Sequence, residues 1–178
     1  RTRFALPEGL IYLDGNSLGA MPRAVSQRLR DATDLEWAQG LIRSWNKAGW
    51  FDMPQRLGDR IAGLIGAGPA EVVATDSTSI NLYKVLSAAL LIARNDHPTR
   101  LRVISERNNF PTDLYIAEGL CREHGGTLTL LEADELQAAL VPESAQDVAV
   151  LLLTHVNYRT GAMHDMAALT VVAHRAGV

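Results

Sequence analysis

From residue 71 onward, short apolar runs of strand length alternate with longer segments whose apolar residues keep helical spacing. The strand-like runs cover residues 71–75, 101–105, 127–131 and 148–153. The last of these is almost continuously apolar, which is typical of a parallel strand covered on both faces. Strands that alternate with helices of ten or more residues favour an α/β fold, with a mostly parallel sheet and helices on both faces.

The expected helices of this alternating part cover residues 80–94, 112–124, 133–140 and 166–176. Earlier in the chain, apolar residues at helical spacing predict a helix from Pro22 to about Gly40. Pro54 is expected to open a second helix, which Gly66 and Gly68 end. Residues 40–51 carry two tryptophans without a clear period, so we expect an irregular loop there.

Composition narrows the classes of partner. The net charge is −3 and no cluster of Lys and Arg is present, which argues against nucleic acid or an anionic membrane as the partner. The longest apolar runs are far shorter than the ~20 residues that cross a bilayer.

Cys121 is the single cysteine, so no intrachain disulfide can form and a cytoplasmic location is expected. His155, His164 and Asp165 match no compact ligand motif, so we expect no metal site.

Three polar loops follow the expected strands, at residues 76–79, 106–113 and 154–161. Ligands of parallel α/β sheets bind at the carboxyl ends of the strands, so these loops are the candidate site. Ser77, Thr78 and Ser79 offer hydroxyls and backbone N–H groups at a helix start, which suit a phosphate. Simple capping of the helix is the alternative interpretation.

Aromatic residues near the other loops allow two interpretations each. Phe110 could stack on a flat heteroaromatic ring, or pack as a hydrophobic staple beside a helix that starts with Pro111. Residues 154–161 form either a solvated loop or part of a site. Trp45 and Trp50 are either core anchors or an aromatic wall for a ring-bearing substrate. These residues alone do not identify a reaction.

Four segments in order carry a resemblance to a known family. They are Y-L-D-G-N-S-L-G at 12–19, D-S-T-S-I-N-L at 76–82, F-P-T-D-L-Y at 110–115 and H-V-N-Y-R-T-G at 155–161. Together they resemble the N-terminal half of bacterial kynureninases, which are fold-type-I pyridoxal-phosphate enzymes of the aspartate-aminotransferase group. The resemblance covers essentially the whole chain. It implies that residues 54–178 are an incomplete large domain that binds the cofactor, preceded by an N-terminal helix and a substrate-side segment at 1–53.

The resemblance also implies a reaction. The family hydrolyses L-kynurenine or 3-hydroxykynurenine to anthranilate or 3-hydroxyanthranilate and L-alanine, in tryptophan catabolism and NAD biosynthesis, as a cytoplasmic homodimer. Another fold-type-I enzyme of the cysteine-desulfurase kind is an alternative. A non-catalytic α/β domain that binds a phosphate ligand is a second one.

Residue roles follow from the matching motifs. Ser77, Thr78 and Ser79 would hold the cofactor phosphate, and Phe110 would stack on the pyridine ring. The other cofactor-binding residues implied are Pro111, Thr112, Asp113 and Thr154. Ser17 and Trp45 would face the substrate. The family's cofactor lysine and the aspartate that pairs with the pyridine nitrogen are expected beyond Val178. We therefore expect no catalytic residue within this chain and no activity from it alone.

Overall fold

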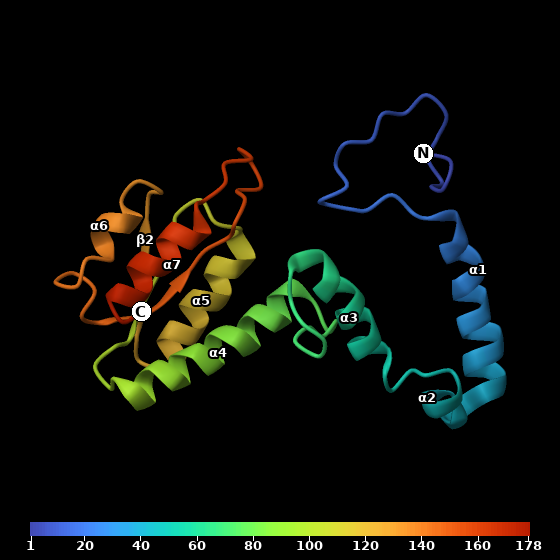
Figure 1. The fold of residues 1–178 in the computed structure, drawn as a ribbon, viewed down its shortest axis with the longest axis horizontal. Helices are drawn as coiled ribbons and strands as arrows, with labels where there is room; N and C mark the ends of the chain where they lie inside the picture. The colour runs from blue at the N-terminus through green and yellow to red at the C-terminus, as the bar shows by residue number, and fades with distance from the viewer. The chain divides into compact units, whose positions relative to one another are not determined.

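The computed structural model describes residues 1–178, which form two compact units, Arg1–Thr75 and Asp76–Val178 (Figure 1). Each unit is described by itself below. The expected division after residue 53 would group residues 54–75 with the second part of the chain. That division concerns the domains of a whole enzyme and stays a prediction.

The first unit is helical. It contains α1 (Arg23–Asp31), the π-helix η1 (Ala32–Gly40), the 3₁₀ turn η2 (Leu41–Arg43), α2 (Ser44–Lys47) and α3 (Met53–Ile65). The helices predicted after Pro22 and at Pro54 are confirmed, although the first continues as a π-helix from residue 32. At Gly66, φ is +77°, and this left-handed conformation suits a glycine that ends a helix.

The irregular loop predicted for residues 40–51 is wrong in its first half, which contains η2 and α2. The cause is a close contact between this segment and η1. The hydroxyl of Ser44 donates a hydrogen bond of 2.6 Å to the carbonyl of Glu36. A Cβ at position 40 would lie 1.9 Å from Ser44 Oγ, so a larger residue there would displace the Ser44 hydroxyl from this hydrogen bond.

The strand predicted at residues 71–75 is also wrong, because this run packs on α3 and pairs with no strand. The carbonyl of Val72 accepts a hydrogen bond from Gln55 Nε2, and the N–H of Ala74 donates to the carbonyl of Pro54. Gly58 permits the approach, since a Cβ there would lie 1.9 Å from the Val72 carbonyl oxygen. Side-chain and backbone groups of α3 therefore satisfy polar groups that a sheet would otherwise pair.

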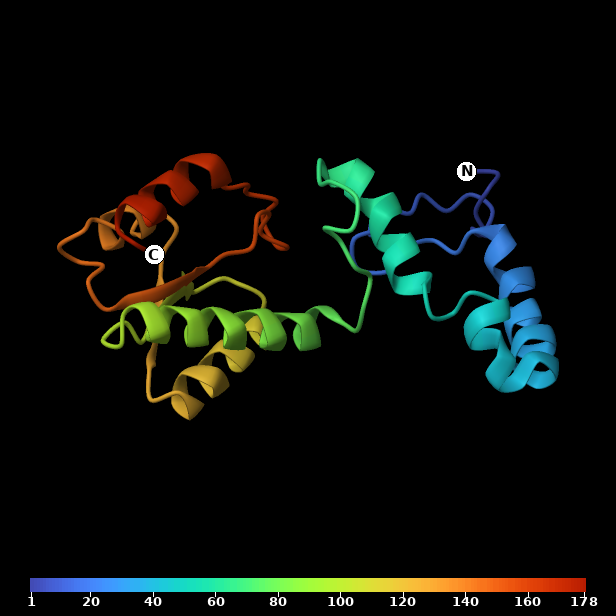
Figure 2. The same cartoon turned by 60° about the horizontal axis from the view of Figure 1, so that its bottom comes forward.

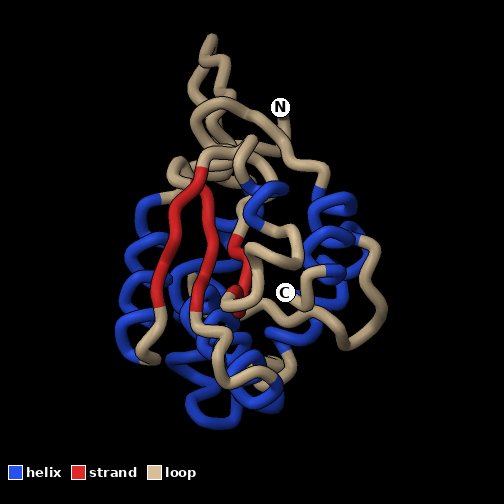
Figure 3. Tube along the Cα trace, turned by 90° about the vertical axis from the view of Figure 1, so that its left-hand side faces the viewer, coloured by secondary structure: helices blue, strands red, loops and turns tan.

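The second unit is built on a parallel sheet. Its elements are α4 (Thr78–Asp96), β1 (Arg102–Glu106), α5 (Pro111–Glu123), β2 (Thr127–Leu131), α6 (Leu136–Ala139), β3 (Val148–Leu152) and α7 (Met166–Arg175). The strand order is β2-β1-β3, and both pairings are parallel. Figure 3 shows the three strands side by side. The helix predicted at residues 133–140 is shorter than expected, because residues 132–135 form a turn that the Glu135 side chain closes on the N–H of Glu132.

Helices cover both faces of this sheet (Figure 2). On one face, α4 and α5 bury an apolar cluster against the strands, formed by Leu86, Leu90, Val103, Ala117, Leu120, Cys121 and Ala149. On the other face, α6 and α7 contribute to a second cluster, formed by Ile104, Leu136, Ala145, Val148, Leu169 and Ala176. Successive residues of β1, Val103 and Ile104, point to opposite clusters, as the alternation of a strand requires. The predicted α/β class with a parallel sheet between helices is confirmed.

None of the helices combines the length and the apolar character that crossing a bilayer requires.

Candidate functional site

The loops that follow β1 and β3 meet through side-chain hydrogen bonds. Thr154, two residues after β3, donates its hydroxyl to Asn109 Oδ1 at 2.6 Å. Asn157 Nδ2 donates to the carbonyl of Asn108 at 3.2 Å. Two of the three polar loops singled out from the sequence are therefore joined at the carboxyl ends of neighbouring parallel strands, where the fold class places ligands.

Residues 155–164 form a small hairpin beside this junction. Val156 and Met163 pair as an isolated antiparallel bridge. Inside the turn, Asn157 Oδ1 accepts hydrogen bonds from the N–H groups of Arg159 and Thr160 at 2.9 and 3.1 Å. One asparagine thus closes the turn through its oxygen and ties the hairpin to the loop after β1 through its nitrogen.

Glu106 and His164 anchor the other end of the hairpin. Glu106 is the last residue of β1, and its Oε2 lies 2.6 Å from His164 Nε2. The two side chains are only 12% and 16% exposed, respectively. Sequence reasoning considered His164 only as a metal ligand. It missed Glu106, whose sole signal was a carboxylate directly after a buried apolar strand.

Phe110 lies at the start of α5, next to the hairpin. Its ring contacts Tyr158 edge-on, with 5.0 Å between the centroids and 65° between the planes, and the residue remains 45% exposed. Pro111 and Thr112 form the first turn of α5 and are exposed. Asp113 lies in the same turn, where burial raises the pKa of its carboxyl group. An exposed aromatic face and a partly buried carboxyl group therefore occur together at this helix start.

The first turn of α4 lies at the same end of the unit as the carboxyl ends of the strands (Figures 1 and 2). Ser77 is the N-cap, and its Oγ accepts a hydrogen bond from the N–H of Ile80 at 3.4 Å. The capping interpretation of Ser77 is thereby confirmed. Thr78 and Ser79 occupy the first two helical positions, where backbone N–H groups have no acceptor within the helix. Asp76, just before them, forms an ion pair with Lys84.

Ser17 and Trp45 belong to the first unit, unlike the other predicted site residues. The hydroxyl of Ser17 donates to Asp14 Oδ1 at 2.8 Å within an exposed turn. Trp45 is 49% exposed and contacts Trp50 edge-on, with centroids 6.3 Å apart. Trp50 Nε1 in turn donates to Glu36 Oε2 at 2.8 Å, and this bond, with the nearby Arg28, lowers the pKa of Glu36. The half-exposed ring of Trp45 thus contacts a neighbour that is itself hydrogen-bonded.

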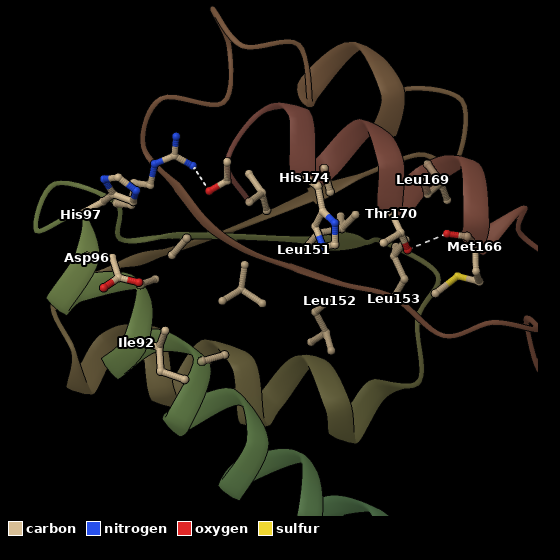
Figure 4. A pocket seen from close by; sticks show the side chains of 18 residues that line it. Ile92, Asp96, His97, Leu151, Leu152, Leu153, Met166, Leu169, Thr170 and His174 are labelled. Carbon is tan, nitrogen blue, oxygen red and sulfur yellow. Dashed lines mark hydrogen bonds between the residues drawn. The ribbon is translucent and has the colours of Figure 1, made fainter. Parts of the chain in front are cut away.

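A cavity of about 580 Å³ in the second unit lies elsewhere. Side chains of α4, β3 and α7 face one another across it (Figure 4). Because β3 is an edge strand, this cavity is the groove along the unpaired edge of the sheet between its covering helices. It contains none of the predicted site residues, and we assign no ligand to it.

The chain is similar to known kynureninases over almost its whole length. It is 57% identical over 180 residues to the kynureninase of Pseudomonas fluorescens, a match that covers 99% of this chain and 42% of that protein. It is 53% identical over 178 residues to the kynureninase of Burkholderia pseudomallei, with the same two shares. The chain therefore spans less than half the length of these relatives. No family model matches. The resemblance stated from the four motifs is confirmed.

Substitutions at Ser77 and Thr78 separate capping from phosphate binding. In the complete protein, Ser77→Ala should lower the free energy of unfolding by about 1 kcal/mol, the usual effect of losing an N-cap. Thr78→Val removes a hydroxyl that caps nothing, so it should leave stability nearly unchanged. If its hydroxyl binds the phosphate of pyridoxal phosphate, as the resemblance implies, the substitution should instead weaken cofactor binding by about 1.5–3 kcal/mol, the size of a hydrogen bond to an ion. Thermal denaturation of the apo protein and cofactor titration measure the two effects. Normal affinity in Thr78→Val would contradict the phosphate role.

Proposed function

We propose that the complete protein containing this chain is a pyridoxal-phosphate-dependent kynureninase. It hydrolyses L-kynurenine, or its 3-hydroxy derivative, to anthranilate, or 3-hydroxyanthranilate, and L-alanine. The observation that carries this proposal is the junction of the loops after β1 and β3 beside an exposed Phe110, in a chain 57% identical to a kynureninase. A cytoplasmic homodimer that acts in tryptophan catabolism and supplies NAD biosynthesis is part of the same proposal.

The start of α4 fits the phosphate of the cofactor. It offers the backbone N–H groups of Thr78 and Ser79 and their hydroxyls at the positive end of a 19-residue helix. The nearest carboxylate, that of Asp76, is paired with Lys84, which reduces its repulsion of an anion. A dianionic phosphate is therefore favoured here without a lysine of its own.

Phe110 fits the pyridine ring. An edge-to-face contact with Tyr158 restrains the Phe110 ring and leaves nearly half of the residue exposed to a stacking partner. Pro111 is the first residue of α5, and its restricted backbone sets the direction of the chain at Phe110, the residue just before the helix. Thr112 and Asp113 directly follow this ring in the first turn of α5, and Thr154 follows β3. We assign these residues to the binding and orientation of the cofactor.

When bound, pyridoxal phosphate supplies an electron sink for cleavage of a bond in an amino-acid substrate. The residues of this chain bind and orient it, and Ser17 and Trp45 are proposed to contact the substrate. The exposed indole of Trp45 suits the aromatic ring of kynurenine. The chain has two lysines. Lys84 forms an ion pair with Asp76, and Lys47 ends α2 in the first unit, so neither belongs to the loops that follow β1 and β3. We propose that the lysine that attaches the cofactor belongs to another part of the complete protein.

The activity itself is tested with the complete protein. Incubation with L-kynurenine should release anthranilate, detected by its fluorescence, together with an equal amount of alanine. Removal of pyridoxal phosphate should abolish the reaction, and its return should restore it. A parallel assay with 3-hydroxykynurenine gives kcat/KM for both substrates. A protein that binds the cofactor but releases neither product from either substrate would contradict the proposed reaction.

Phe110→Leu tests the stacking role. Leucine keeps an apolar side chain but cannot stack, so the affinity for pyridoxal phosphate should fall by about 0.5–1.5 kcal/mol. Tyr115→Leu, on the exposed side of the same helix, is the control and should leave the affinity unchanged. Absorbance titration of the apo protein measures both. Equal affinity of the Phe110 variant and wild type, with intact folding, would exclude stacking.

A further inference from the structure

Asn109 is a buried amide that connects three elements of the second unit. It is 6% exposed and lies between β1 and α5. Its Nδ2 donates to Ser105 Oγ at 3.2 Å, within β1. Its Oδ1 accepts from the N–H of Phe110 at 2.7 Å and from the hydroxyl of Thr154 at 2.6 Å. The side chain thus touches both residues assigned to the cofactor at the ends of β1 and β3.

The orientation of this amide is set by its partners. A backbone N–H can only donate, so the atom facing Phe110 must be the oxygen. The same oxygen faces Thr154, and an amide oxygen cannot donate, so the proton between them belongs to the threonine. The amide nitrogen then points to Ser105, whose hydroxyl accepts. No buried side-chain nitrogen or oxygen of the chain lacks a partner, those of Asn109 included.

The consequence concerns Thr154. A hydroxyl has one proton, and that of Thr154 is committed to Asn109. Toward any ligand, Thr154 Oγ1 therefore offers lone pairs alone. It can accept a hydrogen bond from an O–H or N–H group, and it cannot donate one to a phosphate or carboxylate oxygen.

We propose that Asn109 is a positioning residue of the cofactor site. It holds the backbone of Phe110 at the start of α5 and makes Thr154 an obligatory acceptor that receives a hydrogen bond from an O–H or N–H group of the cofactor. This inference rests on the proposed function. It adds Asn109, which acts through its neighbours and is not proposed to touch the cofactor. It also assigns the direction of the hydrogen bond between the cofactor and Thr154.

The test is a double-mutant cycle on cofactor binding in the complete protein, with Asn109→Ala, Thr154→Val and the double variant. Three quantities are measured: the dissociation constant of pyridoxal phosphate, the visible circular dichroism of the bound cofactor, and the melting temperature of the apo form. Asn108→Ala is the control, since Asn108 is exposed and only its backbone carbonyl is used. The cycle isolates the coupling between the two side chains.

Asn109→Ala should weaken cofactor binding about tenfold, which corresponds to about 1.4 kcal/mol. It should also change the circular dichroism, because the Phe110 backbone and the Thr154 proton both lose their partner. Thr154→Val should weaken binding in the wild type and have little effect in the Asn109→Ala background. Asn109→Asp keeps an acceptor for both donors, and the Ser105 hydroxyl can reverse to donate, so the circular dichroism should return toward wild type. Asn108→Ala should change none of the three quantities.

Two results would overturn the inference while leaving the proposed function intact. One is a wild-type dissociation constant and spectrum in Asn109→Ala with only a lower melting temperature, which is the result of a purely structural role. The other is a loss of cofactor-binding free energy in the double variant that equals the sum of the losses in the two single variants. If Asn109→Ala does not fold, Asn109→Leu replaces it. Leucine has nearly the shape of asparagine but no acceptor for the Phe110 N–H and the Thr154 hydroxyl, so an unchanged spectrum in this variant contradicts the inference. A wild-type protein that binds no cofactor would instead overturn the proposed function, and this inference with it.

Discussion

The parallel pairing of β1 with β3 is the constraint on which the candidate site depends. It brings the carboxyl ends of two strands, which more than forty residues of sequence separate, to the same end of the sheet. β1 is central and almost fully buried, so its register is set by apolar contacts on both faces. The loops leaving these strands are then close enough for Asn109 to bond Thr154 and for Glu106 to bond His164. Core packing therefore positions the polar side chains at the carboxyl ends of these two strands.

Local patterns predicted most of the second unit. The strand at 127–131 and the helices now assigned as α4, α5 and α7 follow from periodicity and from their Gly, Pro and Ser boundaries. The strand predicted at residues 71–75 is wrong, because a β-branched run has the same sequence pattern whether it pairs with a strand or packs on a helix. Gly58, which lets Val72 approach α3, lies fourteen residues earlier in the chain. Tertiary contact overrides strand propensity there.

The candidate site was predictable in its loops but not in its connections. The polar loops after the strands now assigned as β1 and β3, and their motifs, indicated Phe110 and Thr154. The start of α4 was indicated by its motif, although the strand predicted before it does not form. Asn109, Glu106 and Tyr158 were missed as contributors, because their partners lie 45, 58 and 48 positions away in sequence. Only the folded chain shows that these side chains lie together at the carboxyl end of the sheet. The polar residues that link the loops are as much a part of the site as the residues proposed to touch a ligand.

Hydrogen exchange of the complete protein, with and without pyridoxal phosphate, tests the central claim most directly. The account predicts that the cofactor slows exchange in peptides that cover the first turn of α4 and residues 108–114, whose N–H groups lie at the carboxyl end of the sheet. Peptides that cover β2, at the far edge of the sheet, should exchange at an unchanged rate. Protection confined to the groove between α4 and α7, with none at residues 78–80 or 108–114, would contradict the account.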